Sequence, residues 1–250
     1  MRHYDPTYGR FMSVDPLWAK YAPLQPYHYA GNEPIARYDL FGFGVAEVNA
    51  LAKRVDPELK RLYNEALRVL KSTSRYFEFS AAITSTTDGG AHVGLVQWQE
   101  GREIGAQVTT TGQWGAPALP GLLGSAHSHS MPTEEGGNEL WDGIPPSIKD
   151  FIAIGKTAQH LGCDADGHVG FTYAGSVNFA IEVSDPTAAA AFFANEENMK
   201  LINEIFDRAD SVEKLREAMV KLNEIKGQTG IVIYESNRDE IDYNEVGAKE

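Results

Sequence analysis

The hydrophobic positions between residues 45 and 235 change their period several times, and each change predicts a new element. After Asp56-Pro57-Glu58, apolar residues follow at near-helical spacing, which predicts a helix that starts there with proline in its first turn. Short segments rich in β-branched and aromatic residues predict strands. The predicted order is a helix from residue 56, strands at 76–84, 92–99, 103–110 and 122–128, a helix at 147–161, strands at 169–174 and 177–183, helices at 186–206 and 211–225, and a strand at 230–235.

This order predicts an α+β fold, with a mainly antiparallel mixed sheet flanked by helices. Residues 1–44 are different, because they are dense in Tyr, Pro and Gly, show no helical period, and are too few to bury a core alone. From Glu235 to the end, six acidic residues face two basic ones, so we expect this tail to fray. The sequence thus divides into residues 1–44, a domain at 45–235 and an acidic tail at 236–250.

Composition narrows the class of protein. The 250 residues are 42% hydrophobic and include one cysteine, Cys163, which excludes an internal disulfide and a thiolate zinc cluster. No apolar run approaches the roughly 20 residues of a membrane span, and no signal peptide is visible at the N-terminus. The net charge is −13. Such a charge repels phosphates, so nucleic acid is not the expected partner.

Two histidines and one aspartate predict a metal site. His127 and His129 stand two positions apart at the end of a predicted strand, so their side chains point to the same face. Asp150 lies in the first turn of the helix predicted at 147–161 and can supply a carboxylate to the same place. Two imidazoles and one carboxylate suit Zn²⁺ and leave one coordination position open, as in catalytic rather than structural zinc sites.

The N-terminal segment resembles a known family. Residues 4–16 read YDPTYGRFMSVDP, residues 26–34 read PYHYAGNEP, and residues 39–42 read DLFG. These motifs resemble the end of the core of RHS-repeat proteins, in which a shell of strands encloses a variable C-terminal toxin. Leu40 stands where the family's junction motif has proline. The resemblance implies a polymorphic toxin that is delivered into the cytoplasm of a target cell, an RHS shell in the full-length protein, and a cognate immunity protein.

The candidate ligands carry a second resemblance. His127-Ser128-His129 followed by Ser147-x-x-Asp150 resembles the signature of JAMM (MPN-type, JAB-like) metallopeptidases. That family has a cytidine-deaminase-like arrangement and an upstream glutamate, a position that Glu78 matches best, with Glu100 and Glu103 as alternatives. Ser130 replaces the family's proline, and the interval from His129 to Ser147 is longer than usual.

The resemblance implies a zinc-dependent amide or isopeptide hydrolase that acts on a protein or peptide. Glu78 would be the general base, and Ser147 would donate a hydrogen bond to the developing oxyanion. Two alternatives stay open from the residues alone. One is a metal-dependent nuclease that uses the same histidines, and the other is an inactive MPN-type binding module.

Overall fold

The computed structural model describes residues 4–5, 10–11, 44–73, 75, 77–100, 121–129, 143–206, 211–237, 239 and 241–248. Within these residues, seven strands form one sheet in the order β4-β3-β5-β6-β7-β8-β9. The strands are β3 (Phe77–Ser85), β4 (Ala91–Glu100), β5 (Leu122–Ser128), β6 (Val169–Tyr173), β7 (Val177–Val183), β8 (Ile231–Asn237) and β9 (Asn244–Glu245). Every described pair is antiparallel except β5 with β6, which confirms the predicted mixed sheet.

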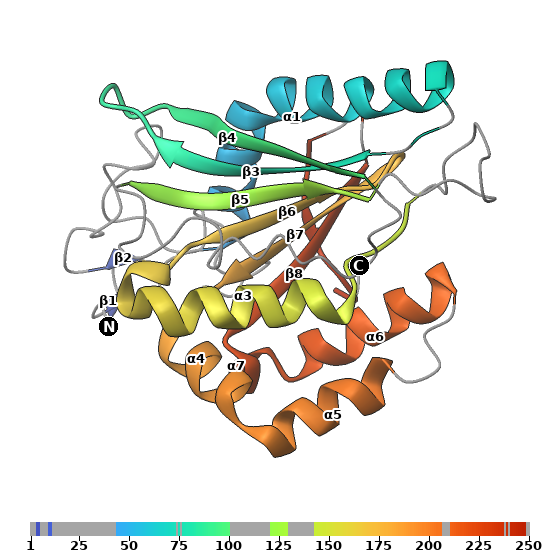
Figure 1. Cartoon of the computed structure of the whole chain (residues 1–250). Helices are drawn as coiled ribbons and strands as arrows, with labels where there is room; N and C mark the ends of the chain where they lie inside the picture. Colours follow the sequence, from blue (N-terminus) through green and yellow to red (C-terminus); the bar gives the residue numbers. More distant parts are fainter. Residues whose placement is uncertain are drawn as a thin grey trace.

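Helices cover both faces of the sheet (Figure 1). On one face lies α1 (Val45–Thr73), and its apolar side packs with alternate residues of the strands, such as Phe79, Ala81 and Phe171. The intervening residues of the strands point to the other face, among them Phe179 and Ile181. That face carries α3 (Ile148–Leu161), η3 (Gly162–Ala165), α4 (Pro186–Ala194), α5 (Glu196–Phe206), α6 (Val212–Glu224) and α7 (Lys226–Thr229). The predicted α+β class is therefore confirmed.

The parallel pair β5–β6 determines where α3 begins. Parallel neighbours cannot be joined by a tight hairpin, so the chain has to return across the sheet between them. Helix α3 makes this return. Its first turn therefore lies at the end of β5, where His127 and His129 are found (Figure 1).

Helix α1 is longer than predicted. It begins at Val45 and continues through Pro57, whereas the sequence predicted a start at Asp56. A proline inside a helix removes one backbone hydrogen bond and costs about 3 kcal/mol. The turns before Pro57 bury Val48, Leu51 and Val55 in the core, and this burial offsets the cost.

The single helix predicted at 186–206 is two helices, α4 and α5. The chain leaves the helical conformation at Asn195, whose ψ is 123°. Its side-chain oxygen accepts hydrogen bonds from the backbone N–H groups of Glu197 and Asn198, at 2.8 and 3.3 Å. Asparagine is a strong N-cap residue, so Asn195 begins α5 as α4 ends.

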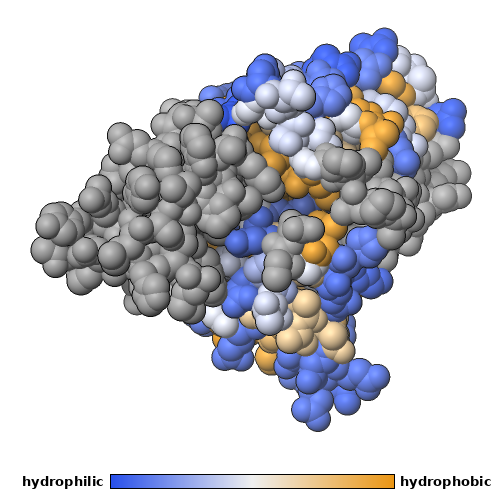
Figure 2. All heavy atoms as spheres, turned by 90° about the vertical axis from the view of Figure 1, so that its left-hand side faces the viewer, coloured by the Kyte–Doolittle hydropathy of each residue, from blue (hydrophilic) through white to orange (hydrophobic). Residues whose placement is uncertain are grey.

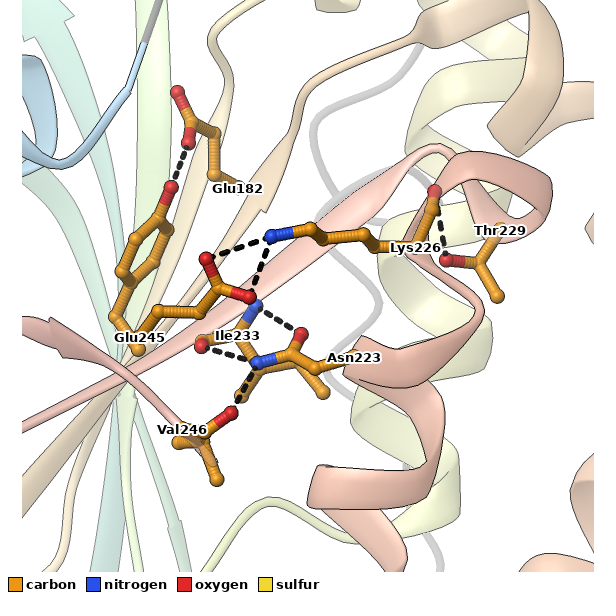
Figure 3. A network of polar contacts seen from close by, with 8 residues as sticks. Glu182, Asn223, Lys226, Thr229, Ile233, Glu245 and Val246 are labelled. Carbon is orange, nitrogen blue, oxygen red and sulfur yellow. Dashed lines mark hydrogen bonds and ion pairs between the residues drawn. The ribbon is translucent and has the colours of Figure 1, made fainter. Parts of the chain in front are cut away.

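The prediction that the acidic tail frays is wrong. Residues 244–245 add β9 to the edge of the sheet, and Tyr243 and Val246 are buried. Figure 3 shows the polar contacts that hold this segment: Asn223 of α6 donates to the carbonyl oxygens of Ile233 and Val246, and Lys226 pairs with Glu245. The buried amide and the ion pair thus fix the tail to the last two helices.

The contact between α3 and α4 depends on a glycine. A Cβ atom at Gly155 would lie 2.7 Å from Cδ1 of Phe193 and nearer still to its Cβ and Cγ atoms. We expect Gly155→Ala to lower the free energy of unfolding by about 1–3 kcal/mol, because overpacking outweighs the better helix propensity of alanine. Urea denaturation measures this change. Gly227→Ala in α7 is the matched control, since nothing lies within 4 Å of its added methyl group. Equal stability of the two variants would contradict the prediction.

The sequence predicted no membrane span. None of the helices in the described ranges is long and apolar enough to cross a membrane. Figure 2 views the end of the sheet that carries the β3–β4 turn and shows hydrophilic residues around a strip of hydrophobic ones.

The RHS-like motifs in residues 1–43 lie outside the described residues, except for the short antiparallel pair β1 (Tyr4–Asp5) and β2 (Arg10–Phe11). The strand predicted at 103–110 and most of the loop before Ser147 lie outside them as well.

Candidate metal centre

The two histidines lie at the end of β5, between β3 and β6. His127 is opposite Ser80 on β3 and opposite Thr172 on β6. The backbone N–H of His129 donates to the carbonyl oxygen of Tyr173 at 2.8 Å, which continues the β5–β6 pairing one residue past the strand. The backbone of both histidines is therefore held by strand pairing, and their imidazoles lie on the same face of the sheet, as predicted.

The first turn of α3 brings Asp150 to the same place. Its Oδ1 atom lies 3.2 Å from Nε2 of His127, and its Oδ2 atom lies 3.5 Å from Nε2 of His129. The two Nε2 atoms are 3.3 Å apart. Despite the long interval between His129 and Ser147, the structure brings the three predicted ligands together.

These distances fit a tetrahedral metal ion. Ligand atoms about 2.0–2.2 Å from zinc at tetrahedral angles are roughly 3.3–3.6 Å from one another. The two Nε2 atoms, at 3.3 Å, and the pair of Nε2 of His127 with Oδ1 of Asp150, at 3.2 Å, are close to this range. One ligand atom from each of the three residues lies within 4.8 Å of the other two. Within the described part of the chain, His127, His129 and Asp150 are the group of His, Cys, Asp or Glu residues placed to hold a metal ion. The side chains of His127, His129 and Asp150 are 28%, 13% and 19% exposed, so the group is partly accessible to solvent.

The orientation of His129 favours metal binding by Nε2. Its Nδ1 atom lies 3.2 Å from the carbonyl oxygen of Ile144, which can only accept a hydrogen bond. Nδ1 is therefore the protonated nitrogen, and in the neutral ring the lone pair is on Nε2. Such a contact to the far nitrogen is usual for histidine ligands of metals. Ile144 belongs to the segment before α3, and no motif in the sequence pointed to it.

Charges in the centre shift two pKa values. Burial by itself would lower the pKa of His129, but the hydrogen bond and the charge of Asp150, helped by the charge of Glu78, raise it to about 9. Burial would raise the pKa of Asp150, but His127 and His129 hold it well below its usual range. His129 therefore carries a proton on both ring nitrogens at neutral pH. A metal ion bound by Nε2 of His129 would displace one of these protons, so we expect metal affinity to rise with pH up to about pH 9.

Glu78 lies on the neighbouring strand β3, two residues before Ser80. Residues two apart on a strand face the same side, so Glu78 and Ser80 share the face of the histidines. The negative charge of Glu78 also contributes to the raised pKa of His129. Among the described residues, Glu78 is not one of the three that can ligate a common ion. This position suits a base that is not a ligand.

A side chain between the two histidines fixes β3 against β5. The hydroxyl of Ser128 accepts a hydrogen bond from the backbone N–H of Phe79 at 3.0 Å, and Ser128 is fully buried. Phe79 follows Glu78 directly. The contact therefore determines how far the glutamate lies from the ligands, a role that the spacing of the motif did not predict.

Three hydroxyl groups surround the ligands. Ser147 donates to Asp150, as described below, and Thr172 lies 3.4 Å from Nε2 of His127. The hydroxyl of Ser80 is buried and has no hydrogen-bond partner among the described residues. Neither Ser80 nor Thr172 was predicted to belong to the site, although the strand period places Ser80 on the same face as Glu78.

The centre thus combines three convergent ligands, a carboxylate on the adjacent strand, and hydroxyl groups on both flanking strands. Compared with known proteins, the chain matches no family model, no curated protein and no solved structure.

Proposed function

We propose that the chain carries a zinc-dependent hydrolase of amide or isopeptide bonds. One observation carries the proposal: His127, His129 and Asp150 each offer one ligand atom within 4.8 Å of the others, and the two imidazole Nε2 atoms are 3.3 Å apart, which suits neighbouring ligands of one zinc ion. Structural zinc sites are normally closed by four protein ligands, so a three-ligand site favours catalysis.

The residues around the ligands support hydrolysis in particular. A zinc ion in this site would polarise a substrate carbonyl and lower the pKa of a water molecule towards neutrality. Glu78 would accept the proton of the attacking water and pass it to the leaving amine. The bond from Nδ1 of His129 to Ile144 keeps the ring in the tautomer that this chemistry needs.

The proposal extends to the biological setting. The resemblance of residues 1–44 to the end of an RHS core supports a polymorphic toxin whose effector domain is delivered into a target cell. An RHS shell in the full-length protein and a cognate immunity protein are the partners that this setting implies. The finer fold assignment, an MPN-type or cytidine-deaminase-like arrangement, rests on the JAMM-like spacing and is compatible with the mixed sheet.

Metal content and cleavage specificity test the proposal together. Protein purified without chelators is expected to hold one zinc ion per chain by mass spectrometry, and to produce new N-termini in a bacterial peptide library or to split isopeptide-linked conjugates. A chelator should stop the cleavage, and added zinc should restore it. Protein that stays free of metal after zinc loading would contradict the proposal. Cleavage of plasmid DNA instead of peptides would favour the nuclease alternative.

A further inference from the structure

Ser147 directs both of its donors to one oxygen atom of Asp150. Its backbone N–H lies 2.6 Å from Oδ2 and its hydroxyl lies 2.8 Å from the same atom. A serine hydroxyl has one proton to donate. While that proton is bonded to Asp150, it is not available to an oxygen of a substrate.

These bonds divide the carboxylate into two parts. Oδ2 accepts two hydrogen bonds from Ser147 and lies 3.5 Å from Nε2 of His129, while Oδ1 lies 3.2 Å from Nε2 of His127 and accepts none from Ser147. The two bonds from Ser147 use the lone pairs of Oδ2. Oδ1 is therefore the oxygen with capacity left for a metal ion on the side of the histidines. Hydrogen bonds to the second oxygen of a ligand carboxylate are a common way to fix its orientation.

We infer that Ser147 is a positioning residue, which holds Asp150 so that Oδ1 completes the metal site, rather than a donor to the oxyanion of the substrate. The inference rests on the proposed function, since it requires a metal ion between the three ligands. Ser147 is the N-cap of α3 and Asp150 is the third residue of that helix. The start of the helix and the metal site thus share one pair of side chains.

An isosteric pair of variants tests the inference by metal affinity. Ser147→Thr keeps the hydroxyl, and Ser147→Val replaces it with a methyl group of the same shape. The backbone at Ser147 is extended, with φ −86° and ψ 167°, which suits both branched residues. We expect Ser147→Val to raise the zinc dissociation constant about 10–100-fold, as loss of a ligand's hydrogen-bond partner does, and Ser147→Thr to restore it to within about threefold. Competition with a chromophoric chelator measures the constants.

A second N-cap serine provides the control for a general loss of capping. Ser211 begins α6, and its hydroxyl accepts a hydrogen bond from the backbone N–H of Lys214 at 3.3 Å. Its backbone is also extended, with φ −140° and ψ 159°. Ser211→Val is expected to lower the free energy of unfolding while it leaves the zinc dissociation constant unchanged.

Different results separate this inference from the proposed function. If Ser147→Val binds zinc as tightly as the wild type but loses roughly 10²–10³ in turnover, Ser147 is an oxyanion donor and only the inference fails. If the wild type binds no zinc, both fail. Should Ser147→Val not fold, Ser147→Ala takes its place against Ser147→Thr, and an unchanged dissociation constant in Ser147→Ala overturns the inference equally.

Discussion

Purified His129→Ala and Asp150→Ala proteins are expected to contain almost no zinc and to lose hydrolytic activity, while the wild type keeps one ion per chain. Each change leaves two ligands of the three. Loss of a residue that hydrogen-bonds to a ligand costs about 10–100-fold in metal affinity, and loss of the ligand itself should exceed that range. Mass spectrometry of the metal and a peptide-cleavage assay measure the two effects.

The control for Asp150→Ala has to remove an acidic residue from the first turn of another helix. Glu213 occupies that place in α6 and is exposed. Glu213→Ala should therefore reproduce any weakening of a helix start and leave zinc content and activity as they are. A zinc content in Asp150→Ala equal to that of Glu213→Ala would remove Asp150 from the ligand set.

Glu78→Gln is expected to separate catalysis from metal binding. The amide keeps the shape of the carboxylate but cannot accept the proton, so turnover should fall about 10²–10⁴-fold, the range for loss of a general base. Zinc content should stay at the wild-type level, because Glu78 is not among the ligands. Turnover at saturating zinc, together with metal analysis, gives both quantities.

The rival glutamate provides a matched variant. In the strand register, Glu100 pairs with Phe77 and Glu78 pairs with Gln99, so the two glutamates are not opposite each other. Glu100→Gln is expected to leave turnover within about threefold of the wild type, since it removes no group from the base's position. If the large loss appeared in Glu100→Gln and not in Glu78→Gln, the assignment of the base would be wrong.

Local patterns predicted most of the elements of the sheet. Strand β5 and the start of α3 at Ser147 agree with the sequence, because their periods and their capping residues are visible within a few positions. The first half of α1 was missed, since Pro57 reads as a helix start unless one knows that the preceding turns are buried. Burial is a tertiary property, and it outweighed the local signal.

The three candidate ligands could be predicted from the sequence, but the fact that they lie together in the fold could not. The spacing of His127 and His129 fixes their common face, whereas the position of Asp150 depends on the direction of β6. Only because β6 runs parallel to β5 does α3 begin at the end of the sheet where the histidines lie. No short motif in the sequence specifies that β6 is parallel to β5, and the length of the interval between His129 and Ser147 is compatible with this arrangement.

The hydrogen bonds between Asn49 and Tyr243 have a consequence for synthesis of the chain. The side chain of Asn49 accepts from the backbone N–H of Tyr243 at 2.6 Å and donates to its carbonyl oxygen at 3.1 Å, across 194 positions. Both residues are buried. Nearly all of the described chain therefore has to be synthesised before Asn49 of α1 can form these hydrogen bonds with Tyr243. Contacts of such long sequence separation form slowly. Folding of the domain is thus completed only after Tyr243 has been synthesised.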